Sequence, residues 1–173
     1  MIMKDKRVLS YKHEDWEKAF LMERDNLIFL LPQYKMNIEH IGATAIKNCR
    51  SFRNVDILIA VSNFADIYTI AMLLASKEYK ELPELGNMNC RVLTKKHKVN
   101  NCGVTVRVVE YASETYNRFV MFKVLLNEDF EKVQGYNYFR ENLLTKVNFD
   151  IAEYNRIKYD YINSFIDEAC KFE

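Results

Sequence analysis

The stretch Ile38–Ile59, IEHIGATAIKNCRSFRNVDILI, contains the pattern that decides the fold of this 173-residue chain. Its first part predicts a short strand over 37–41 that ends at Gly42, and a short helical turn follows. A second strand is predicted over 54–61, and its continuous apolar run is typical of a strand with both faces covered. The unit therefore presents Asp56 on a strand, fourteen residues after Gly42.

Helical patterns surround this strand–turn–strand unit on both sides in the sequence. Apolar residues recur at steps of three and four, and Pro32, Asn63, Ser113 and Asp150 supply stop and cap signals. The predicted helices cover 14–31, 63–77, a segment from Ser113, about 128–146 and a segment from Asp150, and further strands cover 89–94 and 104–111. This order predicts an α+β fold, with a small mixed sheet, helices packed on one side and a helical C-terminal third over about 113–173.

Composition narrows the class of protein. The length fits a single domain over 1–173, and 49% apolar with 28% charged residues is ordinary for a globular protein. The net charge of +1 gives no basic excess, so nucleic acid is not an expected partner. No apolar run approaches the roughly 20 residues of a membrane span, and no secretory signal is visible, so we expect a cytoplasmic protein without membrane contact. The four cysteines contain no CxxC pair, which argues against a zinc site.

The segment after the first strand has the residue types of a phosphate-binding loop. Gly42 would let the backbone approach a ligand, and the amides of Ala43 and Thr44 would open a helical turn that favours phosphate. The Thr44 hydroxyl could bind a phosphate oxygen, and Asp56 could hold Mg²⁺ or Mn²⁺ beside it. A plain turn capped by Thr44, and a strand-end aspartate that caps a neighbouring turn, are the alternative interpretations.

The same segment resembles the GrpB family, which also occurs fused to bacterial dephospho-CoA kinases. The family segment I-G-S-T-[AS]-V-P-G-L aligns without gaps with Ile41–Cys49, and Asp56 falls at the expected offset. Tyr154 and Lys158 resemble a closing Y-x-x-x-K in a terminal helix. The resemblance implies the nucleotidyltransferase fold, a bound nucleotide and divalent metal, and transfer of a nucleotidyl group to an acceptor.

Several positions depart from that pattern. The superfamily signature D-x-[DE] places two carboxylates on one strand face, but the second position here is Leu58. Glu110 is the best candidate for a third carboxylate, as a second ligand to the metal, and His40 could act as a base or be a hydrogen-bonded core histidine. Two-metal transfer would be badly impaired with Asp56 and Glu110 alone. Two hypotheses follow: a nucleotidyltransferase with an incomplete carboxylate set, and a catalytically degenerate nucleotide- or protein-binding module.

Basic side chains offer further candidates. Arg91 and Arg107, on adjacent predicted strands, could bind the phosphates of a nucleotide or another phosphorylated small molecule in one cleft, or could form surface ion pairs. The run 95–98, KKHK, reads as a solvated loop, with a flap over phosphates as the alternative. In the C-terminal helices, an apolar stripe contains Tyr154, Tyr161 and Phe165 and predicts their core packing, and those helices could also offer a surface to a protein partner.

Overall fold

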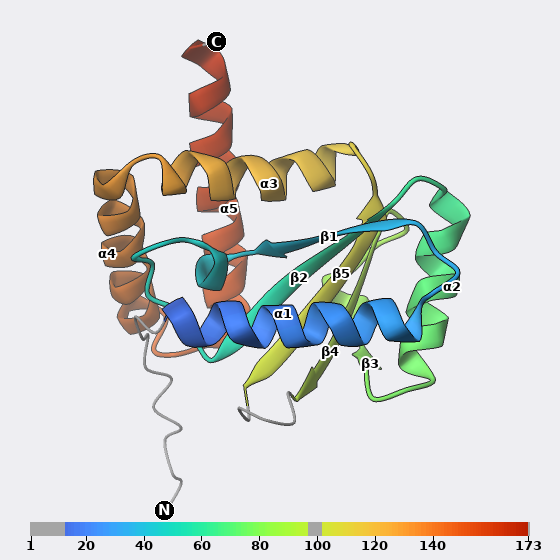
Figure 1. The fold of residues 1–173 in the computed structure, drawn as a ribbon. Helices are drawn as coiled ribbons and strands as arrows, with labels where there is room; N and C mark the ends of the chain where they lie inside the picture. The colour runs from blue at the N-terminus through green and yellow to red at the C-terminus, as the bar shows by residue number, and fades with distance from the viewer. Residues whose placement is uncertain (1–12, 97–101, 173) are drawn as a thin grey trace, which may run out of the picture.

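The computed structural model describes residues 13–96 and 102–172 (Figure 1). The helices are α1 His13–Leu30, α2 Phe64–Ala75, α3 Glu114–Asn127, α4 Phe130–Lys146 and α5 Ile151–Ala169, with short 3-10 turns η1 Ala43–Ala45, η2 Pro83–Leu85 and η3 Cys170–Phe172. The strands are β1 Met36–Ile41, β2 Asn54–Val61, β3 Lys80–Glu81, β4 Cys90–Lys96 and β5 Gly103–Glu110. No helix within these ranges has the length and apolar character needed to cross a membrane.

The five strands form one mixed sheet in the order β1-β2-β5-β4-β3. Only β2 and β5 run parallel, while β1 with β2, β4 with β5 and β3 with β4 are antiparallel. The register places Ile41, the last residue of β1, opposite Asp56, and places Asp56 opposite Thr105. The predicted α+β class, with a small mixed sheet and a helical C-terminal third, is confirmed.

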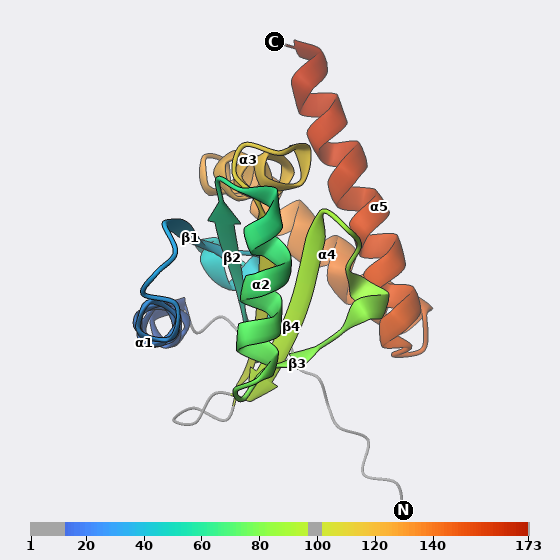
Figure 2. The same cartoon turned by 90° about the vertical axis from the view of Figure 1, so that its right-hand side faces the viewer.

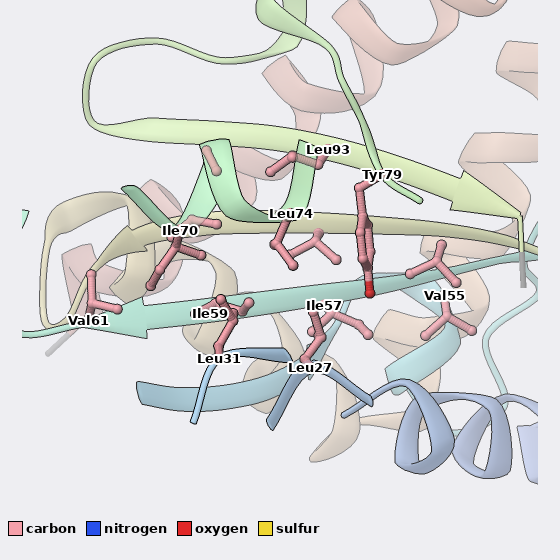
Figure 3. Packing of buried hydrophobic residues seen from close by; sticks show 14 of the residues in the cluster. Leu27, Leu31, Val55, Ile57, Ile59, Val61, Ile70, Leu74, Tyr79 and Leu93 are labelled. Carbon is pink, nitrogen blue, oxygen red and sulfur yellow. The ribbon is translucent and has the colours of Figure 1, made fainter. Parts of the chain in front are cut away.

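One face of the sheet carries the main apolar core. Alternate residues of β2 point toward α1 and α2, because side chains along a strand alternate between its faces (Figure 3). Leu27 and Leu31 approach from the first helix segment, and Ile70 and Leu74 approach from α2. The β2 residues in this cluster are Val55, Ile57, Ile59 and Val61. Burial of this many branched side chains supplies the main driving force for folding.

The other face of the sheet is covered as well, so helices lie on both sides rather than on one as the sequence predicted. Leu58 and Ala60 of β2 are buried in a second cluster against Tyr116, Phe119 and Val120 of α3. Figure 2 shows α1 and α5 on opposite sides of the sheet. The physical reason lies in β2 itself, since both sets of its alternating residues are apolar beyond Ile57 and both must be removed from water.

The helices α3, α4 and α5 pack on one another through aromatic rings. The Phe122 and Tyr136 rings meet edge to face with centroids 5.1 Å apart, and Phe139 stacks on Tyr161 at 3.9 Å. The loop after β1 inserts Ile46 into the same cluster. Core packing of Tyr154, Tyr161 and Phe165, as the sequence indicated, is confirmed, and the C-terminal helices hold the Gly42 segment in place.

Helix starts follow the local cap signals. The side chains of Asn63, Ser113 and Asp150 each accept a hydrogen bond from a backbone amide of the first turn that follows. These bonds satisfy amides that have no partner within the helix. The starts of α2, α3 and α5 therefore lie where the sequence placed them.

Candidate functional site

Polar side chains gather on the second face of the sheet, at the end where β2 begins. Asn54 and Asp56 of β2 lie beside Thr105 and Arg107 of β5. The Asn54 amide nitrogen lies 3.2 Å from the Thr105 hydroxyl oxygen, and Arg107 Nη1 donates to Asp56 Oδ1 at 3.0 Å. Toward the other end of the same face, Leu58 and its neighbours are apolar and covered by α3. The face is thus divided into an apolar half under α3 and a polar half around Asp56.

Gly42 packs directly against Asp56. Its φ of 72° and ψ of −171° lie in a region that is essentially restricted to glycine. A Cβ atom at this position would lie 2.9 Å from Asp56 Oδ2. The glycine that the sequence suggested for close approach of a ligand therefore allows close approach of the Asp56 carboxylate.

Two cations from the C-terminal helices complete the site. Lys158 of α5 is partly buried, its Nζ donates to Asn155 Oδ1 at 3.2 Å, and it lies 5.5 Å from the centre of the Tyr154 ring. Burial lowers the pKa of the Lys158 ammonium to about 8; the nearby positive charges of Arg140 and Arg107 lower it as well, and the negative charge of Asp56 acts in the opposite direction. Charged residues of β2, β5 and α4 thus influence the pKa of Lys158.

Arg140 of α4 is the buried member of this group, with 2% of its surface exposed. Its Nε donates to the Tyr154 hydroxyl at 2.9 Å, and its Nη1 donates to the Arg50 carbonyl. The Cys49 sulfur lies 3.5 Å from Arg140 Nη1, and burial raises the pKa of that thiol. No carboxylate of the described residues forms an ion pair with Arg140 or with Lys158.

Asp56, Arg107, Arg140 and Lys158 together form what we call the Asp56 cluster. The cluster holds one carboxylate and three cations: Asp56 pairs with Arg107, and among the described residues no ion pair joins Arg140 or Lys158 to a carboxylate. Charges removed from water are costly unless they are paired, and a cluster with this balance favours an anion. The side chains of Asp56 and Arg107 are 27% and 23% exposed, so an anion can reach them from solvent.

The predicted phosphate loop, residues 42–44, makes its contacts within the protein. Thr44 is 2% exposed, and its hydroxyl lies 3.0 Å from His40 Nε2. Ala43 packs against the aromatic cluster of the C-terminal helices. The turn η1 has only three residues, and the Thr44 hydroxyl has its partner within the protein. These features favour a structural turn over a phosphate loop, but the predicted cap is wrong: Gly42 is the N-cap residue and no side chain caps the turn, because the Thr44 hydroxyl contacts His40 instead.

His40 faces away from Asp56. It lies opposite Ile57 in the β1–β2 register, whereas the next residue, Ile41, lies opposite Asp56. Its ring stacks on Phe20 of α1 with centroids 4.7 Å apart. Because neighbouring residues of a strand point to opposite faces, the structure does not bring the predicted base to the Asp56 cluster.

Glu110 is also distant from Asp56 along the sheet. It lies opposite Val61 at the far end of the parallel pair, whereas Asp56 lies opposite Thr105 near its beginning. At roughly 3.3 Å per residue, the five positions between Thr105 and Glu110 correspond to about 16 Å. The two carboxylates that the sequence suggested as joint metal ligands are not brought together.

Arg91 and Arg107 point to opposite faces of the sheet. Arg107 lies opposite Val92 in the β4–β5 register, one residue beyond Arg91. Arg91 Nε donates to Glu81 Oε1 at 2.5 Å, and its guanidinium lies 5.5 Å from the centre of the Tyr68 ring of α2. The predicted shared cleft does not form, and only Arg107 belongs to the Asp56 cluster.

The basic run beginning at Lys95 also differs from the prediction of a solvated loop. Lys95 Nζ lies 2.8 Å from Glu23 Oε1, with both side chains almost fully buried on the α1 side of the sheet. Tyr79 and Asn26 also donate to this carboxylate. Residues 97 and 98 of the run, on which the flap hypothesis depends, lie outside the described residues.

The donors around Asp56 do not fit the divalent metal site that the resemblance implies. Across the ranges 13–96 and 102–172, no group of three or more histidine, cysteine, aspartate or glutamate side chains could hold a metal ion. Leu58, at the position of the second carboxylate, is fully buried among apolar side chains. Mg²⁺ and Mn²⁺ are bound in proteins mainly by several oxygen ligands, and here a guanidinium occupies one side of the Asp56 carboxylate.

Comparison with known proteins gives the family. The family model described as GrpB protein matches residues 7–168. The chain belongs to the GrpB family. Glutamate-rich protein GrpB of Alkalihalophilus pseudofirmus is 24% identical over 170 residues, which cover 96% of this chain and 98% of that protein. The crystal structure of GrpB from Enterococcus faecalis superimposes with a TM-score of 0.79 at 21% identity, covering 95% of this chain and 98% of that one.

Two more distant matches are complexes of the non-canonical poly(A) polymerase GLD-2. The complex with RNP-8 gives a TM-score of 0.49 at 14% identity over 80% of this chain and 44% of that chain. The complex with GLD-3 gives 0.47 at 13% identity over 76% of this chain and 45% of that chain. The GrpB comparison at 0.79, by contrast, spans nearly the whole of both chains and establishes the shared GrpB fold.

Sequence reasoning did not assign Arg140 and Lys158 to the site. Both lie on helix faces that are otherwise apolar, since Tyr136 precedes Arg140 by one helical turn and Tyr154 precedes Lys158 by one turn. A charged residue on a buried stripe is the signal that could have found them. Their place in the Asp56 cluster, however, depends on how α4 and α5 return to the sheet.

Proposed function

We propose that this GrpB-family protein is a binding module for a nucleotide or another phosphorylated small molecule, and that it holds the phosphate without a divalent metal. The observation that carries the proposal is the charge of the Asp56 cluster, which holds three cations and one carboxylate. Of the two hypotheses drawn from the sequence, this is the non-catalytic one.

The chemistry of the cluster supports phosphate as the bound group. The Arg107 guanidinium is planar and always charged, so it can bind two phosphate oxygens at once. Lys158 adds a second positive charge from α5, on the side of the site formed by the C-terminal helices. Arg140 is too deeply buried to touch a ligand, but its charge adds to the potential and its hydrogen bond to Tyr154 fixes the neighbouring part of α5.

The position of Asp56 supports binding rather than two-metal transfer. In the transfer chemistry implied by the resemblance, Asp56 would be a metal ligand and would need further carboxylates close by. Here its carboxylate is the internal partner of Arg107, and an incoming phosphate would compete with it for the guanidinium. Asp56 therefore limits the affinity for an anion instead of providing it.

This difference gives a test in which the two hypotheses predict opposite signs. ATP binding is measured by isothermal titration calorimetry on the parent and on Asp56→Asn, once in EDTA and once in Mg²⁺. We expect binding in EDTA and roughly three- to tenfold tighter binding by Asp56→Asn, which corresponds to about 0.7–1.4 kcal/mol. The control Asp25→Asn breaks another Asp–Arg pair, on the exposed surface of α1, and should leave the affinity unchanged.

Two results would contradict the proposal. ATP binding that requires Mg²⁺ and is lost in Asp56→Asn would establish Asp56 as a metal ligand and favour the nucleotidyltransferase hypothesis. Binding that is unaffected by Arg107→Met would place the nucleotide away from the Asp56 cluster.

A further inference from the structure

The polar half of the sheet face continues beyond β5, across β4 and onto the edge strand β3. The register pairs Thr105 with Thr94 and Thr94 with Lys80, so these three side chains lie on one face. Lys96 lies on the same face, because it is two residues beyond Thr94 on β4. Thr105 also lies opposite Asp56, so the two lysines share the face of the Asp56 cluster.

Lys80 and Lys96 differ from the cations on the other side of the same sheet. On the side of α1 and α2, Arg91 Nε donates to a carboxylate at 2.5 Å, and Lys95 Nζ lies 2.8 Å from another. Lys80 and Lys96 are exposed, and neither forms an ion pair with any carboxylate that the structure describes. Their charges are therefore available to an anion that arrives from solvent.

The two lysines lie near each other and apart from Arg107. They stand on adjacent strands two register positions apart, which at about 4.8 Å between strands and 3.3 Å per residue separates their Cα atoms by about 8 Å. Lys80 is two strands and two positions away from Arg107, which corresponds to about 12 Å. The Arg107 guanidinium is moreover held at 3.0 Å by Asp56 of β2, on the side away from β3. The face thus offers positive charge at two separate places.

We propose that Lys80 and Lys96 form a second anion subsite, and that the ligand is a small molecule with two phosphate groups about 10 Å apart, such as a sugar bisphosphate. The inference rests on the proposed phosphate site, which it deepens by naming the class of ligand. Arg107 would hold one phosphate, and the two lysines would hold the other. Thr94 and Thr105 lie between the two subsites and are partly exposed, so their side chains suit the hydroxyl groups of a sugar.

The test compares fructose 6-phosphate with fructose 1,6-bisphosphate by isothermal titration calorimetry in EDTA. For the parent protein we expect the bisphosphate to bind about tenfold more tightly, which is the size expected of two exposed charge-assisted contacts. For the double variant Lys80→Met and Lys96→Met, we expect this ratio to fall to about twofold, because only the statistical advantage of a second phosphate remains. Both positions are exposed, so the thermal midpoint should stay near that of the parent.

A matched control removes the same charge from the other side of the sheet. The double variant Lys18→Met and Lys77→Met acts at exposed positions of α1 and of the segment after α2, and it should keep the ratio of the parent. An equal loss in both double variants would show that net charge alone sets the ratio and would overturn the inference. Substitutions of Lys80 and Lys96 that weaken pyrophosphate binding by the same factor would also overturn it, because the adjacent phosphates of pyrophosphate cannot span the two subsites.

Other outcomes separate the second subsite from the phosphate site at Arg107. If Arg107→Met abolishes binding of both sugar phosphates but the parent does not favour the bisphosphate, the phosphate site stands and the second subsite is refuted. The same holds if the bisphosphate does not bind to a protein that binds ATP. Lys80 and Lys96 would then only protect the sheet edge from pairing with another strand, a common role of lysines on edge strands. Binding of both compounds that is unaffected by Arg107→Met would overturn the phosphate site and this inference with it.

Discussion

The substitution Lys158→Met should make the protein more stable at neutral pH. Methionine keeps the length of the side chain and its packing beside the Tyr154 ring, and it removes the charge that burial disfavours. The structure places the pKa of Lys158 at about 8, against an ordinary value of 10.5. Between these two pH values the unfolded chain binds more protons than the folded one, so the free energy of unfolding rises with pH across this window. The penalty of the charged form is fully present below pH 8.

The size of the expected stabilisation follows from the difference between the two pKa values of Lys158. Each pH unit of pKa difference corresponds to about 1.4 kcal/mol, so the full interval amounts to about 3 kcal/mol. Lys158 is only partly buried, and water around its amine reduces this figure. We therefore expect Lys158→Met to raise the free energy of unfolding by about 1–3 kcal/mol at pH 7, and the gain to shrink as the pH approaches 10.5.

Urea denaturation of parent and variant at pH 7, 8.5 and 10 measures the difference directly, because effects of other titrating groups cancel in the comparison. Lys18→Met, on the exposed surface of α1, is the control and should stay within about 0.5 kcal/mol of the parent at every pH. A Lys158→Met variant that is less stable than the parent at pH 7, or a gain that does not change with pH, would refute the reasoning.

Three further substitutions test the packing around the site. Gly42→Ala should lower the free energy of unfolding by about 1–3 kcal/mol, because its Cβ would lie 2.9 Å from an Asp56 oxygen at a φ of 72°; an unchanged urea midpoint would contradict this. Leu58→Asp should lose about 3 kcal/mol or more without gaining Mn²⁺ affinity in calorimetry, because the new carboxylate would be buried among apolar side chains; tight Mn²⁺ binding by the variant would reveal a latent metal site. Glu23→Gln should lose about 3–5 kcal/mol in thermal unfolding, because Lys95 would keep a buried charge without its partner, and adding Lys95→Met should recover part of the loss; stability within 0.5 kcal/mol of the parent would be inconsistent with a buried pair.

Local signals allowed most elements to be predicted from the sequence. The strand Asn54–Val61 was predicted with the bounds that the structure shows, because a continuous apolar run between polar residues marks both of its ends. The caps at Asn63, Ser113 and Asp150 act within one turn, so they could be recognised without knowledge of the fold. The strand Lys80–Glu81 has only two residues, which is too short for its pattern to be recognised in the sequence. It forms because it pairs with β4.

Which side chains share the face of Asp56 depends on the register of the strands, and the sequence does not reveal that register. A shift of one residue along a strand moves a side chain to the other face of the sheet. The predictions for His40 and Arg91 assumed the face of Asp56, and the pairing with β2 and β5 places both on the opposite face. Arg107 lies on the face of Asp56, and its partnership with Asp56 depends on the parallel pairing of two distant strands.

The Asp56 cluster departs from the rule that a buried charge is paired with an opposite charge. The Glu23–Lys95 pair shows the usual arrangement of a buried charge, with a carboxylate oxygen 2.8 Å from the Lys95 ammonium. Arg140 and Lys158 have neutral partners instead, although a methionine at position 158 would relieve the cost by a single substitution. Stability alone does not account for that arrangement, because it would favour the uncharged residue. Departures of this kind are expected at functional sites, where binding a ligand supplies the missing charge. Stability and binding are therefore coupled, because the substitution that stabilises the free protein, Lys158→Met, is the one that should weaken its hold on a phosphate.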